Sequence, residues 1–243
     1  MIYNGFECEE FEFEGYPAKV IFPKEKSEKA TLLIKTEYFN AFPETEIKLT
    51  EKGNYLSFIK NDNRWGTAED IDRKARFIKY LINKYKIPCG CVPVGMSCGG
   101  IFAVKLAAKY PEIVSCIYVD APVVNYMSCP CGFGNGKSLN DDNSEIMNAL
   151  SFGSTGELLA YRDMPLDNLP KLIQNKIPLV LVAGDSDEIV PFEENGVFIK
   201  NAYLKAGIPF EYYIKKGCNH HPHGLFDPAP VVDFIMRNRR ECK

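Results

Sequence analysis

Gly95-Met96-Ser97-Cys98-Gly99 lies between a mostly apolar run, residues 89–94, and a helical pattern over residues 100–110. A serine between two glycines on a sharp strand-to-helix turn is the pattern of a nucleophile elbow. Glycines are needed there because the flanking backbones pass too close for a Cβ. The helix N-terminus favours negative charge that develops beside the serine. The pattern predicts a nucleophilic Ser97, although an ordinary turn serine has the same local signature.

The size and charge of the chain restrict its class. The chain has 243 residues, 46% of them hydrophobic, and a formal net charge of −3. We expect a single domain over residues 1–243 and no nucleic-acid partner. The start of the chain lacks a signal-peptide pattern, and no apolar run approaches the ~20 residues that cross a membrane. We therefore expect no membrane association and a cytoplasmic location.

The nine cysteines, an odd number, favour reduced thiols over a disulfide framework. Cys89 and Cys91 fall in a predicted buried strand, where both face one side as small hydrophobic residues. Cys129 and Cys131 lie in a predicted loop. They could be redox-sensitive thiols, or two ligands of a zinc ion that would need further ligands. We predict no metal and no cofactor.

The remaining pattern alternates strands with helices. This predicts an α/β fold: a mostly parallel twisted sheet with helices on both faces. Residues 125–175 depart from the alternation, and we expect a small lid insertion there. The expected strands are an N-terminal antiparallel hairpin at residues 7–14 and 18–22, interrupted by Gly15-Tyr16-Pro17, and residues 31–34, 55–59, 89–94, 115–119, 179–183 and 210–214. The expected helices occupy residues 44–52 and 100–110 and begin near Thr67 and at Asp227-Pro228.

A serine hydroxyl needs a base and an orienting carboxylate. The three histidines all fall in residues 217–224, after the last predicted strand. Asp185 and Asp187 follow the strand at residues 179–183, at the same expected edge of the sheet. The chain order Ser, Asp, His is that of α/β-hydrolases and differs from the two other common serine-triad folds.

Over essentially its full length the chain resembles the α/β-hydrolase superfamily, in particular small bacterial serine esterases. The resemblance rests on the elbow, on Gly184-x-x-Asp187-x-x-Val190-Pro191 and on the late His220. It implies Asp187 rather than Asp185 as the acid and His220 as the base. His221 and His223 are expected to hydrogen-bond within their loop. A three-histidine zinc site is the alternative, disfavoured because His220 and His221 would point apart on an extended backbone.

These roles predict an acyl-enzyme mechanism. His220 accepts the proton of Ser97 during attack on a carbonyl, and Asp187 holds the imidazole. The backbone N–H of Cys98 is expected as one oxyanion donor, and the amide of Glu37 or Tyr38 as the second.

The substrate is less constrained by the sequence. Tyr38, Trp65 and Tyr126 are the expected substrate-binding aromatics. We predict hydrolysis of small carboxylic esters, with acetyl or other acyl groups on carbohydrates or small metabolites. The alternatives are a prolyl-oligopeptidase-like serine peptidase, whose relatives usually carry a large extra domain, and a non-catalytic ligand-binding protein on this fold.

Overall fold

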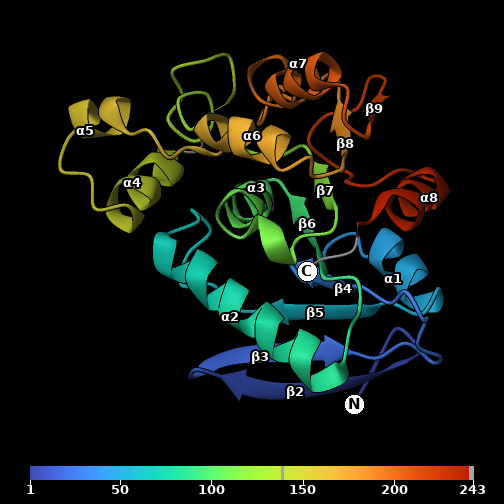
Figure 1. The fold of residues 1–243 in the computed structure, drawn as a ribbon. Coiled ribbons are helices and arrows are strands. Elements are labelled where there is room, and N and C mark those ends of the chain that lie inside the picture. Colours follow the sequence, from blue (N-terminus) through green and yellow to red (C-terminus); the bar gives the residue numbers. More distant parts are fainter. Residues whose placement is uncertain (138–139, 241–243) are drawn as a thin grey trace.

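A twisted nine-stranded sheet forms the centre of this computed structural model, which describes residues 1–137 and 140–240, without the side chains of 140–142 (Figure 1). The strand order is β1-β2-β3-β5-β4-β6-β7-β8-β9. Strands β4 to β9 pair in parallel, whereas β1, β2 and β3 form an antiparallel edge that joins the rest of the sheet at β5. The strands are β1 (Ile2–Tyr3), β2 (Phe6–Phe13), β3 (Tyr16–Ile21), β4 (Leu32–Lys35), β5 (Tyr55–Ile59), β6 (Cys91–Met96), β7 (Ile117–Asp120), β8 (Leu179–Gly184) and β9 (Phe210–Lys215).

Helices cover both faces of the sheet, and together with the strand pairing this confirms the predicted α/β-hydrolase fold class. One apolar core joins the sheet to α2 (Ala68–Tyr85), α3 (Gly99–Lys109), α6 (Pro165–Gln174) and α7 (Gly196–Ala206). A second core lies on the opposite face under α1 (Glu44–Glu51) and α8 (Ala229–Asn238). Two short 3-10 helices span Pro111–Ile113 and Phe192–Glu194.

Two local predictions need correction. The hairpin turns at Glu14-Gly15, where both residues have positive φ, so Pro17 lies inside β3 opposite Glu12. Strand β6 begins at Cys91 because Gly90 has a left-handed φ of 61°, which interrupts extended backbone. Cys89 and Cys91 are both buried, but they do not share one strand face.

The range predicted as a lid insertion, residues 125–175, falls between β7 and β8. It holds α4 (Asn140–Ala149), α5 (Thr155–Ala160) and α6. Helix α6 is a core element, because Leu169 and Leu172 are buried in the cluster that α3 also enters. The predicted range 125–175 therefore includes a regular crossover helix, and the segment that extends from the sheet is α4 with α5 (Figure 1).

None of the eight cysteines that the structure describes is in a disulfide. None of the helices within residues 1–137 and 140–240 combines the length and apolar character that crossing a bilayer requires.

Candidate active site

Ser97 lies on the turn between β6 and α3, with its backbone at a φ of 52°. A positive φ is strained for a residue with a Cβ, so surrounding contacts must hold it. The Ser97 N–H donates to the carbonyl of Asp120 at 3.0 Å, and the Val123 N–H donates to the carbonyl of Ser97 at 3.0 Å. Both partners belong to β7 and the loop after it, so the neighbouring strand fixes the elbow.

The glycines around Ser97 are required by close backbone approach. A Cβ on Gly95 would lie 2.5 Å from the carbonyl oxygen of Gly99. A Cβ on Gly100 would collide with Pro122, which follows β7. The Gly-x-Ser-x-Gly spacing thus reflects how tightly α3 packs on the strand that precedes it.

Asp187 follows β8, and its carboxylate is held by backbone amides. Its Oδ1 accepts the N–H groups of Ile189 at 2.9 Å and Val190 at 2.8 Å. Burial raises the pKa of Asp187, but hydrogen bonds from His220 and from these two amides outweigh burial and bring its pKa below the usual value. The carboxylate is therefore ionised at neutral pH.

Asp185, the other candidate acid, has a different position. Its Oδ1 accepts the N–H of Gly217 at 2.7 Å and bonds the Ser186 hydroxyl at 3.0 Å. These contacts join the loops after β8 and β9. The structure thus brings Asp187, and not Asp185, to the histidine.

His220 joins the other two residues. Its Nδ1 lies 2.8 Å from Asp187 Oδ2, and its Nε2 lies 3.0 Å from Ser97 Oγ. An ionised carboxylate only accepts, so Nδ1 carries the proton and Nε2 accepts the Ser97 hydroxyl. The His220 side chain is 8% exposed. The ends of β6, β8 and β9 thus bring a hydroxyl, a carboxylate and an imidazole into one hydrogen-bonded chain.

The other two histidines differ from their predicted positions. His223 does not bond within its loop: its Nδ1 lies 2.9 Å from Asp120 Oδ1, at the end of β7. His221 is exposed, and its ring stacks on Phe42 with centroids 5.8 Å apart. The His220 and His221 rings do not point apart, because their centroids are only 4.8 Å from each other. The loop is folded back on itself and not extended, which is why that prediction is wrong.

The predicted oxyanion loop follows β4. Tyr38 has a φ of 52°, and its N–H lies 3.4 Å from Glu37 Oε1. Cys98 is the N-terminal cap of α3. The Tyr38 side chain lies beside the Cys98 thiol and the Arg64 guanidinium, and burial is the largest reason that the pKa of Tyr38 is raised. The Glu37 carboxylate accepts a hydrogen bond from Asn61 Nδ2.

A cavity of about 500 Å³ opens beside Ser97. This volume suits a small ligand. Most of the wall is apolar or aromatic, with an arginine and the histidines as polar groups. The lining residues are Tyr38, Ala41, Phe42, Arg64, Met96, Ser97, Cys98, Cys129, Ile189, His220, His221 and His223.

Tyr38 therefore reaches the cavity, but Trp65 and Tyr126 do not line it. Both side chains are fully buried, with 0% exposure. Tyr126 donates its hydroxyl to the Trp65 carbonyl at 3.1 Å, and Trp65 Nε1 donates to Glu145 Oε2 at 3.2 Å. Their apolar area is used in the core, the more common role of large aromatics, and the prediction that they bind substrate is not supported by their positions.

Arg64 is a cavity residue that the sequence predictions missed. Its Nε donates to Glu145 Oε2 at 2.9 Å, and its guanidinium lies 5.1 Å from the Trp65 ring centroid. Its position next to Trp65, a predicted substrate-binding residue, could have indicated that Arg64 lies near the site. The direction of the Arg64 side chain, however, depends on its contact with Glu145 of α4.

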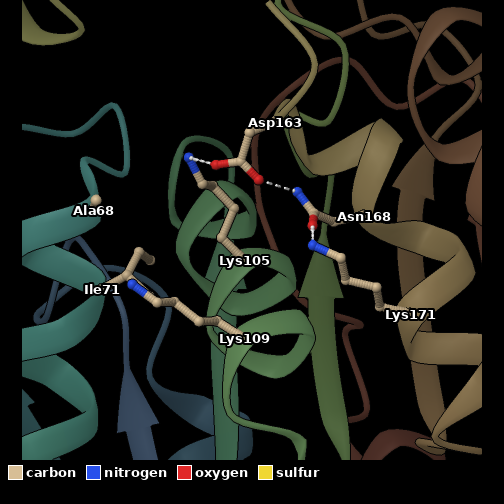
Figure 2. A pocket seen from close by; sticks show the side chains of 7 residues that line it. All are labelled: Ala68, Ile71, Lys105, Lys109, Asp163, Asn168 and Lys171. Carbon is tan, nitrogen blue, oxygen red and sulfur yellow. Dashed lines mark hydrogen bonds and ion pairs between the residues drawn. The ribbon is translucent and has the colours of Figure 1, made fainter.

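A second cavity, of about 280 Å³, lies between α2, α3 and α6 (Figure 2). Lys105 pairs with Asp163 at 3.0 Å, and Lys171 donates to Asn168 at 2.8 Å. Its seven described lining residues include no serine, cysteine or histidine. It therefore lacks a hydroxyl or thiol paired with an imidazole, and the site at Ser97 is the candidate active site.

Comparison with known proteins gives one family match. The profile described as the prolyl oligopeptidase family (Peptidase_S9) matches residues 55–229, which include Ser97, Asp187 and His220. No curated protein sequence matches the chain.

Several solved structures share the fold. An acylaminoacyl peptidase of Pyrococcus horikoshii superposes with a TM-score of 0.74 at 15% identity, over 98% of this chain and 42% of that one. A puromycin-hydrolyzing peptidase of Mycobacterium tuberculosis gives 0.72 at 15%, over 94% and 37%. Dipeptidyl peptidase 4 of Porphyromonas gingivalis gives 0.70 at 16%, over 98% and 36%. The chain thus spans well under half the length of each.

Proposed function

Because the chain belongs to the prolyl oligopeptidase family of serine hydrolases, we propose that it is a serine peptidase that cleaves short peptides or aminoacyl amides. The observation that carries the proposal is the position of His220, 3.0 Å from the Ser97 hydroxyl and 2.8 Å from the Asp187 carboxylate. This chain of hydrogen bonds activates a serine that is otherwise a weak nucleophile.

In the proposed first step, Ser97 Oγ attacks the scissile carbonyl carbon while its proton moves to His220 Nε2. Asp187 stabilises the imidazolium that forms. The tetrahedral oxyanion would accept hydrogen bonds from the Cys98 N–H and from Tyr38, through its amide or its hydroxyl. Collapse expels the leaving amine, which takes the proton from His220, and leaves an ester on Ser97.

In the second step, water attacks that ester. His220 accepts a proton from the water, and then returns a proton to Ser97 Oγ as the acid product leaves. The net reaction is hydrolysis of one amide bond, and Ser97 and His220 return to their starting states.

The cavity supports an acyl group larger than acetyl. Its volume of about 500 Å³ exceeds the needs of a two-carbon group, and the Arg64 guanidinium adds a polar contact opposite the apolar walls. The similar solved structures are named as an acylaminoacyl peptidase, a puromycin-hydrolyzing peptidase and a dipeptidyl peptidase, and all three names favour a peptidase over an esterase.

We also propose that the segment after β7 borders the substrate entrance, as a small lid. Cys129 lines the cavity, and Glu145 of α4 holds Arg64 through an ion pair of 2.9 Å. Movement of α4 would therefore change the position of Arg64 in the cavity.

The test compares matched p-nitroanilides and p-nitrophenyl esters with acetyl, alanyl, N-acetylalanyl and glycylprolyl acyl parts. We expect the anilides to be cleaved, and kcat/KM to rise from acetyl to the larger acyl parts in both series. Cleavage of acetate and other small esters alone would contradict the peptidase proposal and favour a carboxylesterase. Failure of Ser97 to be labelled by a fluorophosphonate, with no turnover, would favour a non-catalytic binding protein. Ser97→Ala is the matched control.

A further inference from the structure

The loop after β9 brings three imidazoles together at the mouth of the cavity. One nitrogen from each of His220, His221 and His223 lies within 4.8 Å of the others. The three pairs of ring centroids are 4.8, 5.0 and 4.9 Å apart, with rings inclined at 63–86° to one another. Hydrolysis as derived above uses only the first of these rings, which leaves the cluster without an explanation.

We propose that His220, His221 and His223 form a binding site for a divalent transition-metal ion, with zinc as the best fit, and that the bound ion blocks Ser97. Imidazole is a preferred ligand of zinc, copper and nickel. Three protein nitrogens with a fourth position open to solvent are a common arrangement around zinc.

The tautomers of two rings suit metal binding. His220 Nδ1 faces Asp187 at 2.8 Å, and His223 Nδ1 faces Asp120 at 2.9 Å. Both carboxylates are buried acceptors, so both Nδ1 atoms carry protons and both Nε2 atoms present lone pairs. A carboxylate behind a histidine in this way orients the ring and makes its free nitrogen a stronger ligand.

The charges around the cluster also favour a cation. Asp187 and Asp120 place two buried carboxylates behind the rings. Two cations oppose them: Lys215, whose Nζ lies 3.9 Å from Asp120 Oδ1, and Arg64 across the cavity, which is paired with Glu145. Lys215 therefore offsets part of the Asp120 charge, whereas Arg64 is paired with Glu145. The Asp187 carboxylate and the remainder of the Asp120 charge are what attract a cation at the rings.

Only a small closure of the cluster is needed. With bonds of ~2.0–2.1 Å, the nitrogens around a tetrahedral zinc ion are about 3.4 Å apart. His221 can supply this movement because it is exposed and its ring contacts are with Phe42 and the other two histidines. Ser97 Oγ, 3.0 Å from His220 Nε2, or a water would occupy the fourth position.

The consequence is inhibition. A metal ion on His220 Nε2 occupies the lone pair that accepts the Ser97 proton, so the nucleophile loses its base. This consequence depends on the proposed hydrolase function, but the metal site itself does not.

The first experiment is calorimetric titration of the full chain with zinc chloride. We expect one ion per chain in the wild type and in Ser97→Ala, which keeps all three imidazoles. His221→Ala and His223→Ala should each weaken zinc binding by about 10–100-fold or more. Loss of a residue that hydrogen-bonds to a metal ligand already has an effect of this size, and here the ligand itself is removed. His221→Gln, which preserves the size of the side chain, guards against loss of folding.

The controls locate the ion. The double variant Cys129→Ser with Cys131→Ser should bind zinc as the wild type does; loss of binding there would assign the ion to loop thiols and overturn the proposal. Absence of wild-type binding, or unchanged affinity in both His221 variants, would overturn it too.

The second experiment separates the two proposals. Zinc should abolish wild-type hydrolysis, and EDTA should restore it. The zinc concentration for half-inhibition should rise about 10–100-fold in His221→Ala, measured against that variant's own metal-free rate. Zinc binding without any effect on hydrolysis would overturn the inhibition. A chain that binds zinc through these histidines but hydrolyses no substrate would refute the proposed function and leave the metal site standing.

Discussion

Two histidine–carboxylate pairs lie side by side at the carboxyl edge of the sheet, and they differ in what the free nitrogen meets. His220 faces Asp187 at 2.8 Å, and His223 faces Asp120 at 2.9 Å, with ring centroids 5.0 Å apart. His220 Nε2 reaches the Ser97 hydroxyl. In the second pair Asp120 also accepts the N–H of Gly224 at 2.6 Å, which ties the loop to β7.

The comparison shows that a histidine with a carboxylate is not by itself a catalytic device. Both rings have an orienting acceptor of the same kind. The two rings differ in the strand ends that they meet. His220 bridges Asp187, which follows β8, and Ser97, which follows β6. His223 meets Asp120 at the end of β7, the strand between those two. We assign chemistry to the first pair and support of the loop to the second.

The largest effect is expected when a reacting group, Ser97 or His220, is removed. Ser97→Ala and His220→Ala should each lower kcat by roughly 10⁶-fold, because the two groups act as a unit. His223→Ala should lower kcat far less. The measurement is hydrolysis of the best p-nitroanilide, with circular dichroism to establish folding. A Ser97→Ala protein within tenfold of the wild-type rate would refute the assignment.

A sharper comparison changes one carboxylate at a time. Asp187→Asn should lower kcat by about 10⁴-fold, because an amide donor at this position favours the wrong imidazole tautomer. Asp120→Asn keeps an acceptor for Gly224 and should lower kcat by less than about tenfold. Equal losses in the two variants would show that the pairs are not functionally distinct.

A Tyr38 variant tests whether the hydroxyl of this residue donates a hydrogen bond to the oxyanion formed beside Ser97. Tyr38→Phe keeps the half-buried ring and removes the hydroxyl. A loss of about 10²–10³ in kcat, with little change in KM, is expected if that hydroxyl donates to the oxyanion. An unchanged kcat would assign donation to the backbone amides alone.

The smallest expected effect is on stability as a function of pH. The pKa of Asp187 is lower in the folded chain than its unfolded value of about 3.9. Its ionised form therefore stabilises the fold above that value, and this contribution disappears as the pH falls through the folded pKa. The free energy of unfolding of the wild type should exceed that of Asp187→Asn at pH 7, and the difference should shrink below about pH 4. Urea titrations at both pH values measure it; a difference that grows in acid would contradict the hydrogen-bonding account.

Much of the fold is readable from the sequence, because its signals are local. The glycines at positions 95, 99 and 100 report the close packing of a helix on a strand, and the structure shows those contacts. The alternation of strands and helices indicated a parallel sheet with two covered faces. The spacing of Asp187 before Val190-Pro191 matches amides that bind its carboxylate. The order of serine, aspartate and histidine reports the order of the strand ends.

The misses have a common cause. Trp65 and Tyr126 sit near strand ends in sequence, yet both turn inward because α3 and the segment after β7 cover them. Arg64 enters the cavity because Glu145, far along the chain, holds it.

By itself, then, the sequence determined the sheet, the elbow and the set of groups available for chemistry, because neighbouring residues constrain backbone geometry directly. Only the tertiary structure decided that Asp120 meets His223, where Arg64 points, and that His220, His221 and His223 meet. Those choices depend on loops from β7, β8 and β9 that are distant in the chain and adjacent in space, and burial and hydrogen bonding between loops set them.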